Sequence, residues 1–73
     1  MPKRIYVGNL PGTMSRRQVE ELFAKYGDVS SVELSRDGKA YVEMTSGADE
    51  AIKALDHRQM DGKSLNVNEA LGR

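Results

Sequence analysis

The spacing of apolar side chains is the feature that most constrains how this chain can fold, because it changes repeatedly between two periods. Four segments alternate apolar and polar residues, as half-buried strands do. They cover residues 4–10 (with the strand ending near Gly8), 29–35, 40–44 and 64–68. Two other segments repeat apolar residues every three or four positions, as amphipathic helices do. They cover residues 15–27 and 46–56. The order β-α-β-β-α-β predicts an α+β fold.

Each predicted helix carries one apolar stripe. The first stripe consists of Val19, Leu22, Phe23 and Tyr26. The second consists of Ala48, Ala51, Ile52 and Leu55. Two such helices and four half-buried strands fit a single sheet with both helices on one face. The other face of the sheet is then open to water, so the residues that point toward it are the candidates for function.

Local signals mark the ends of both helices. Ser15 suits the N-cap of the first helix, and Gln18 completes a capping box with it. Gly27 is expected to end this helix in the left-handed conformation. Ser46 is expected to cap the second helix.

The connection between the second and third strands can be decided from side-chain parity. A two-residue loop would place Leu34, which faces inward, opposite Tyr41, which faces outward, although opposed residues share a face. A three-residue loop over residues 36–38, with Gly38 in the left-handed conformation, places Leu34 opposite Ala40 instead. We therefore predict the three-residue loop.

Composition excludes several kinds of site. The chain has no cysteine and a single histidine, His57, so it can form neither disulfides nor a zinc cluster, and we expect no metal and no cofactor. Eleven basic and eleven acidic residues balance to zero formal charge, which is not typical of proteins that bind duplex phosphates indiscriminately. Apolar runs are too short to span a bilayer, and no signal peptide is visible. We expect a soluble protein of the cytoplasm, or of the nucleus in a eukaryote.

Two segments carry a resemblance to a known family. IYVGNL (residues 5–10) and DGKAYVEM (residues 37–44) resemble the RNP2 and RNP1 motifs of the RNA recognition motif (RRM) family. The segments LFAKYGDV, AIKAL and GKSLNVNEA follow the family's pattern in order, so the likeness covers nearly the whole chain. It is similar to compact single-domain members, including small bacterial ones. The resemblance implies that residues 1–73 form one RRM domain, a ferredoxin-like βαββαβ sandwich with antiparallel strand order 4-1-3-2.

That strand order implies a binding surface on the open face. The first and third strands would be neighbours, so Tyr6 and Tyr41 would stand side by side at the family's base-stacking positions. A stacked base contributes about 1–3 kcal/mol to binding. The resemblance thus implies a monomer that binds single-stranded RNA, with single-stranded DNA as the alternative ligand and no membrane association. For each tyrosine alone, the plain alternative is a good strand former.

Four polar residues complete the expected RNA-binding site: Arg4, Lys39, Asn66 and Asn68. The two cations can contact phosphates, with Lys3 and Arg36 near the rim, and the two amides can pair with base edges. Lys39 stands where RNP1 usually has an aromatic residue, and Glu33 and Glu43 share the face and repel phosphate. We therefore expect weaker binding than a full RNP1 motif gives. A solubilising charge or a polar filler on an edge strand is the alternative role for these residues.

Other functions find less support in the sequence. GNLPGT lacks the length and the lysine of a phosphate-binding loop, and no catalytic triad or paired-histidine motif is present, so we predict no catalysis. A protein-interaction module that binds a peptide on its helical side is the main alternative. It rests on RQM (residues 58–60) with Glu20 and Glu21, a partial match that lacks a phenylalanine. Such domains generally have degraded RNP motifs, whereas this chain keeps both tyrosines, which favours RNA.

Overall fold

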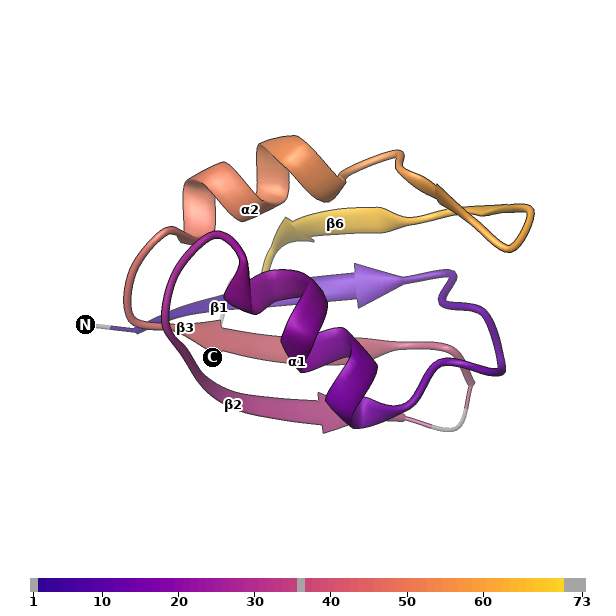
Figure 1. The fold of residues 1–73 in the computed structure, drawn as a ribbon, viewed down its shortest axis with the longest axis horizontal. Helices are drawn as coiled ribbons and strands as arrows, with labels where there is room; N and C mark the ends of the chain where they lie inside the picture. The colour runs from indigo at the N-terminus through magenta and orange to yellow at the C-terminus, as the bar shows by residue number, and fades with distance from the viewer. Residues whose placement is uncertain (1, 36, 71–73) are drawn as a thin grey trace.

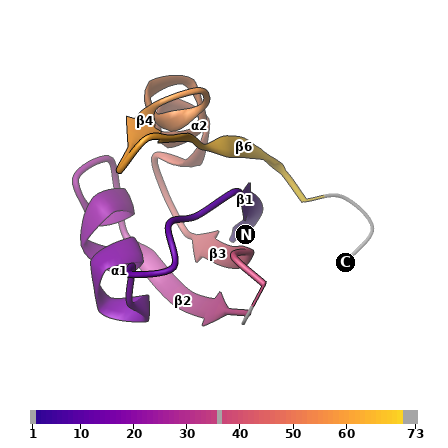
Figure 2. The same cartoon turned by 90° about the vertical axis from the view of Figure 1, so that its right-hand side faces the viewer.

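The computed structural model describes residues 2–35 and 37–70, and it confirms the predicted fold class (Figure 1). The elements in chain order are β1 (Lys3–Gly8), α1 (Arg16–Ala24), β2 (Val29–Leu34), β3 (Ala40–Met44), α2 (Ala48–Leu55), β4 (Gln59–Met60), β5 (Lys63–Ser64) and β6 (Asn66–Glu69). Four strands form an antiparallel sheet in the order β2-β3-β1-β6, which is the predicted order read from the other edge. Both helices pack on the same face of this sheet (Figure 2).

The core lies between the helices and the inward residues of the strands. Its buried side chains are Ile5, Val7, Leu10, Val19, Leu22, Phe23, Val32, Ala40, Val42, Met44, Ala48, Ala51, Leu55, Leu65 and Val67. No polar or charged residue in the described part of the chain is buried. Leu34 was expected among them, but it remains 39% exposed. It lies at the end of the edge strand β2, in a groove that Pro11 and Met14 also line.

The connection between β2 and β3 has the predicted register. Leu34 pairs with Ala40, and Glu33 pairs with Tyr41. Gly38 has a φ of 79°, in the left-handed region, as the parity argument required. Its carbonyl oxygen also accepts a hydrogen bond of 3.0 Å from the amide of Leu10, which ties the hairpin to the loop after β1. The predicted rim position of Arg36 lies outside the described residues.

Gly27, after the end of α1, has another role than the sequence suggested. The capping box of Ser15 and Gln18 is present as predicted, but the C-cap of α1 is Lys25 in the right-handed conformation, and Gly27 does not have a positive φ. A Cβ on Gly27 would overlap the carbonyl oxygen of Ser46 instead. Gly27 is therefore needed because the loop after α1 and the loop before α2 touch through their backbones.

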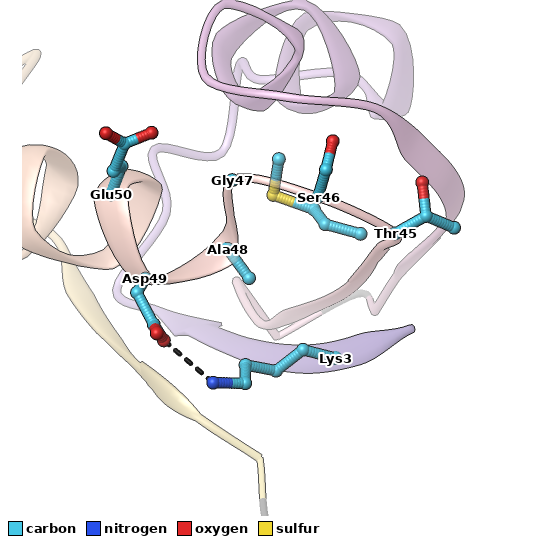
Figure 3. Close-up of a pocket in the computed structure, with 8 residues that line it drawn as sticks. Lys3, Thr45, Ser46, Gly47, Ala48, Asp49 and Glu50 are labelled. Atoms are coloured by element: carbon cyan, nitrogen blue, oxygen red, sulfur yellow. Dashed lines mark hydrogen bonds and ion pairs between the residues drawn. The ribbon is translucent and has the colours of Figure 1, made fainter. Parts of the chain in front are cut away.

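The predicted cap of α2 is also wrong. Gly47, with a φ of 74°, occupies the N-cap position, and no side chain caps the helix. The hydroxyl of Ser46 accepts a 3.2 Å hydrogen bond from the amide of Asp28, in the loop after α1, and so links the two loops. A Cβ on Gly47 would overlap the carbonyl oxygen of Tyr26, so the contact between the loops constrains both glycines. Figure 3 shows Ser46 and Gly47 at this point of the chain.

The short hairpin of β4 and β5 was not expected. Asp61 and Gly62 connect its strands, and both have a positive φ, of 50° and 81°. This is the conformation that a type I′ turn requires, and an Asp-Gly pair is its usual sequence. Met60 lies in β4 and is partly buried against the core.

The left-handed conformation of Gly38 yields a stability prediction. Gly38→Val should lower the free energy of unfolding by more than about 1 kcal/mol, because a β-branched residue is strained at this φ. Its Cβ would also lie 3.2 Å from the carbonyl oxygen of Leu10. Urea unfolding followed by circular dichroism measures the change. Gly12→Val is the matched control, since a Cβ there meets nothing within 4 Å. Equal stability of the two variants would contradict the assigned turn.

Candidate nucleic-acid interface

The open face of the sheet carries two adjacent tyrosines at its centre. Tyr6 of β1 and Tyr41 of β3 are direct partners across the two strands. Their ring centroids are 5.6 Å apart, and the ring planes are inclined at 56°. Both side chains are half-buried. The face opposite the helices therefore presents two aromatic surfaces that solvent, or a ligand, can reach.

The absence of a side chain at Gly8 leaves room for the ring of Tyr6. Gly8 lies two residues after Tyr6 and so points to the same face, yet it is buried. A Cβ on Gly8 would lie 2.7 Å from the hydroxyl oxygen of Tyr6 and 3.1 Å from two ring carbons. The ring thus leans along β1 and covers Gly8. Sequence analysis missed this role, although a glycine inside a strand often marks a close approach of another group.

The two asparagines flank Tyr6 from the edge strand β6. Asn68 pairs with Tyr6, and Asn66 pairs with Gly8. Both residues are exposed, and no hydrogen bond joins either amide side chain to another group within residues 2–35 and 37–70. Because the ring of Tyr6 leans over Gly8, Asn66 stands beside the ring, whereas Asn68 stands beside the backbone of Tyr6. Both amides are thus available for hydrogen bonds next to one aromatic surface.

Arg4 is the cation most closely associated with the aromatic pair. The carbon of its guanidinium lies over the ring of Tyr41, 4.6 Å from the ring centroid. One guanidinium nitrogen is 3.2 Å from a carboxylate oxygen of Glu33. Glu43 faces the same side, and its carboxylate accepts a 3.4 Å hydrogen bond from the hydroxyl of Ser31. Together with Tyr41, these residues surround a hollow of about 50 Å³.

Lys39 directly precedes β3, next to the turn that connects it to β2. Its ammonium nitrogen lies 4.0 Å from a carboxylate oxygen of Asp37, and its side chain is exposed. The hydroxyl of Ser35 donates a hydrogen bond to Asp37, and this contact, more than the charge of Lys39, lowers the pKa of Asp37 below its usual value. Lys39 is therefore only loosely held, which leaves it free to approach another anion.

Lys3 does not belong to the open face, contrary to expectation. It pairs with buried Met44 across β1 and β3, so it points toward the helical side. Its ammonium nitrogen is 2.8 Å from Asp49 (Figure 3). The same nitrogen is 4.0 Å from Glu69. The hydrogen bond to Asp49 raises the pKa of Lys3 and lowers the pKa of Asp49. Lys3 thus neutralises carboxylates on the helical side and leaves the open face with fewer cations than expected.

Other kinds of site find no basis in the described residues. No group of three or more His, Asp or Glu side chains within residues 2–35 and 37–70 could hold a metal ion. None of the described helices is long and apolar enough to cross a membrane. A hollow of about 360 Å³ at the start of α2 is lined by Lys3 with Asp49 and Glu50, and its one cation is already paired with Asp49 (Figure 3).

Comparisons with known proteins agree with this geometry. The serine/arginine-rich splicing factor SR34B of Arabidopsis thaliana is 43% identical over 76 residues, which cover 96% of this chain and only 27% of that protein. RbpF of a Nostoc species, which is named as an RNA-binding protein, is 41% identical over 75 residues, covering 90% of this chain and 71% of that protein. The crystal structure of the RNA-binding protein PG1 matches with a TM-score of 0.88 and 34% identity, and the match covers 97% of this chain and 96% of that chain.

The family itself is identified by a sequence model. The model described as the RNA recognition motif matches residues 5–66, which include both motif segments, both tyrosines and Lys39. The relatives, including the small Nostoc protein, confirm the predicted resemblance and support RNA binding. This chain belongs to the RNA recognition motif family.

Proposed function

We propose that residues 1–73 form one domain that binds single-stranded RNA on the open face of the sheet, without catalysis. The observation that carries the proposal is the pairing of Tyr6 with Tyr41 at the centre of that face, with ring centroids 5.6 Å apart. Aromatic side chains on a sheet bind RNA by stacking on unpaired bases. The proposal includes action as a monomer, in the cytoplasm or in the nucleus of a eukaryote, with single-stranded DNA as the alternative ligand.

The tilt of the two rings bears on the kind of strand that fits. Because the ring planes are inclined at 56°, two bases that stack on them cannot remain parallel to each other. Successive bases of a flexible single strand can splay in this way, whereas bases within a duplex stay stacked and paired. The tilt therefore favours unpaired nucleotides as the ligand.

Asn66 and Asn68 supply hydrogen-bonding groups beside the ring of Tyr6. Each amide offers both a donor and an acceptor, which is what the edge of a base requires. Asn66, beside the leaning ring of Tyr6, is placed to read the base on that ring, and Asn68 is placed to contact the same nucleotide or its neighbour. Any sequence preference of the domain is proposed to arise here.

The peptide-binding alternative draws less support from the structure. Of the segment RQM, Arg58 and Gln59 are exposed, but Met60 is partly buried against the core. A methionine in that position supports the fold and presents little surface to a partner. We therefore retain RNA as the proposed ligand.

The stacking role of the tyrosines can be tested by substitution. Tyr41→Ala should weaken the binding of a single-stranded RNA by about 1–3 kcal/mol, because one stacked base is lost. Fluorescence anisotropy with a short labelled oligonucleotide of mixed sequence measures the affinity. Tyr41→Phe is the control and should bind nearly as well, since it keeps the ring. A folded Tyr6→Ala/Tyr41→Ala variant with unchanged affinity would show that RNA binds elsewhere.

Gly8 offers a separate test of the position of the Tyr6 ring. Gly8→Ala should displace the ring, because the new Cβ would lie 2.7 Å from its hydroxyl oxygen. Alanine suits an extended backbone and the ring can move, so the free energy of unfolding should change by less than about 1 kcal/mol. The RNA affinity should nevertheless fall severalfold. Gly12→Ala, where a Cβ meets nothing within 4 Å, should leave it unchanged. An unaltered affinity in both variants would contradict the role of the leaning ring.

The charge balance of the open face predicts a weak dependence of binding on salt. Two or three phosphate contacts give a slope of about −1.4 to −2 for log K against log salt concentration. Lys39→Gln should flatten the slope by less than about 0.7, because a mobile lysine holds one phosphate only part of the time. Lys53→Gln, the same change at an exposed position of α2 on the other side of the sheet, is the control and should leave the slope unchanged. A slope steeper than about −4 would require a basic surface other than this one.

A further inference from the structure

Three residues on three neighbouring strands form one continuous contact across the open face. The sheet order places β3 between β1, which carries Arg4, and β2, which carries Glu33 (Figure 1). Tyr41 of β3 pairs directly with Glu33. To reach Glu33, the side chain of Arg4 has to cross β3, and it does so over the ring of Tyr41. The ion pair between Arg4 and Glu33 therefore holds a guanidinium on the aromatic ring.

This arrangement places two flat groups in competition for one surface. A guanidinium within about 6 Å of an aromatic centroid is attracted to the face of the ring. Here the distance is 4.6 Å, so the guanidinium lies where a base that stacks on that face of Tyr41 would have to lie. Both cannot occupy the position together. A base that stacks there has to displace Arg4 and break its ion pair with Glu33.

We propose that Arg4 is a displaceable cap on Tyr41, that Glu33 holds it there, and that RNA binding transfers the guanidinium from the ring to a phosphate. The inference rests on the proposed function and adds a regulatory step to the same site. In this arrangement Glu33 opposes RNA in two ways: its charge repels phosphate, and its ion pair keeps Arg4 on the stacking surface. Arg4 is correspondingly a cap on the ring of Tyr41 in the free protein and a phosphate ligand in the complex, and Glu33 is the positioning residue.

Glu43 provides a matched comparison for Glu33. It faces the same side of the sheet and pairs directly with Arg4 across β1 and β3. Its carboxylate contacts the hydroxyl of Ser31, and within residues 2–35 and 37–70 no ion pair joins it to Arg4. Replacement of either glutamate by glutamine removes one negative charge from the same face. Only the replacement of Glu33 also releases the cap.

The experiment compares the two substitutions in RNA binding at about 0.15 M salt, where repulsion between exposed charges is screened. Glu33→Gln should tighten the binding of a mixed-sequence single-stranded RNA about threefold to fivefold, which is the upper part of the range expected for release of an exposed ion pair. Glu43→Gln should tighten it less than about twofold, because it removes only screened repulsion. Equal effects of the two substitutions would overturn the cap, since repulsion alone would then explain both.

A double-mutant cycle isolates the contribution of Arg4. When Arg4→Gln is also present, the cap is absent, so Glu33→Gln and Glu43→Gln should have the same small effect. If the larger effect of Glu33→Gln persists without the guanidinium, Glu33 acts through some group other than Arg4 and the proposal fails. Circular dichroism and urea unfolding of each variant establish that all of them are folded.

A measurement without RNA separates this proposal from the proposed function. In nuclear magnetic resonance spectra of the free protein, the side-chain protons of Arg4 next to its guanidinium should be shifted upfield by the ring of Tyr41. Glu33→Gln should reduce this shift, and Glu43→Gln should preserve it. An unshifted Arg4 in a protein that still binds RNA would refute the cap alone. If the shift is present and no single-stranded oligonucleotide binds, the proposed function fails and the regulatory role fails with it.

Discussion

The antiparallel pairing of β1 with β3 is the constraint on which the rest of the structure depends. These are the two central strands, and their register places Ile5 opposite Val42 on one face and Tyr6 opposite Tyr41 on the other. A shift of one residue in either strand would exchange the two faces and bury tyrosines where valine and isoleucine belong. The burial of apolar side chains against α1 and α2 therefore also fixes the distance between the two aromatic rings. Core and candidate binding surface are two results of one register.

Much of this arrangement could be predicted from the sequence because it follows from local periodicity and parity. Alternation in the strands determined which side chains face outward, and parity alone determined the loop that contains Gly38. The capping box of Ser15 was likewise predictable, since all of its partners lie within one helical turn. For the tyrosines, strand order had to come from the family resemblance, because alternation gives the face of a residue but not its neighbour on the next strand.

The features that were missed depend on contacts between distant segments or on side-chain conformation. Gly27 and Ser46 follow the usual patterns of helix ends, but the contact between their two loops assigns them other roles. Leu34 has the parity of a core residue, yet it lies at the end of an edge strand and is 39% exposed. The position of Arg4 over Tyr41 requires the relative placement of three strands and the length of one side chain. The Asp-Gly turn of β4 and β5 is different, because its sequence signal was present in full.

The absence of buried polar residues from the described part of the chain has a consequence for how such a domain can change. The ion pairs of Lys3, Arg4 and Arg17 lie at the surface, where single pairs contribute little to folding. Residues of the open face can therefore be exchanged with little effect on the stability of the domain. Natural selection or protein engineering can replace the charged residues and the asparagines of this face, and so change the affinity and the preference for a ligand over a wide range. The scaffold beneath continues to fold in the same way.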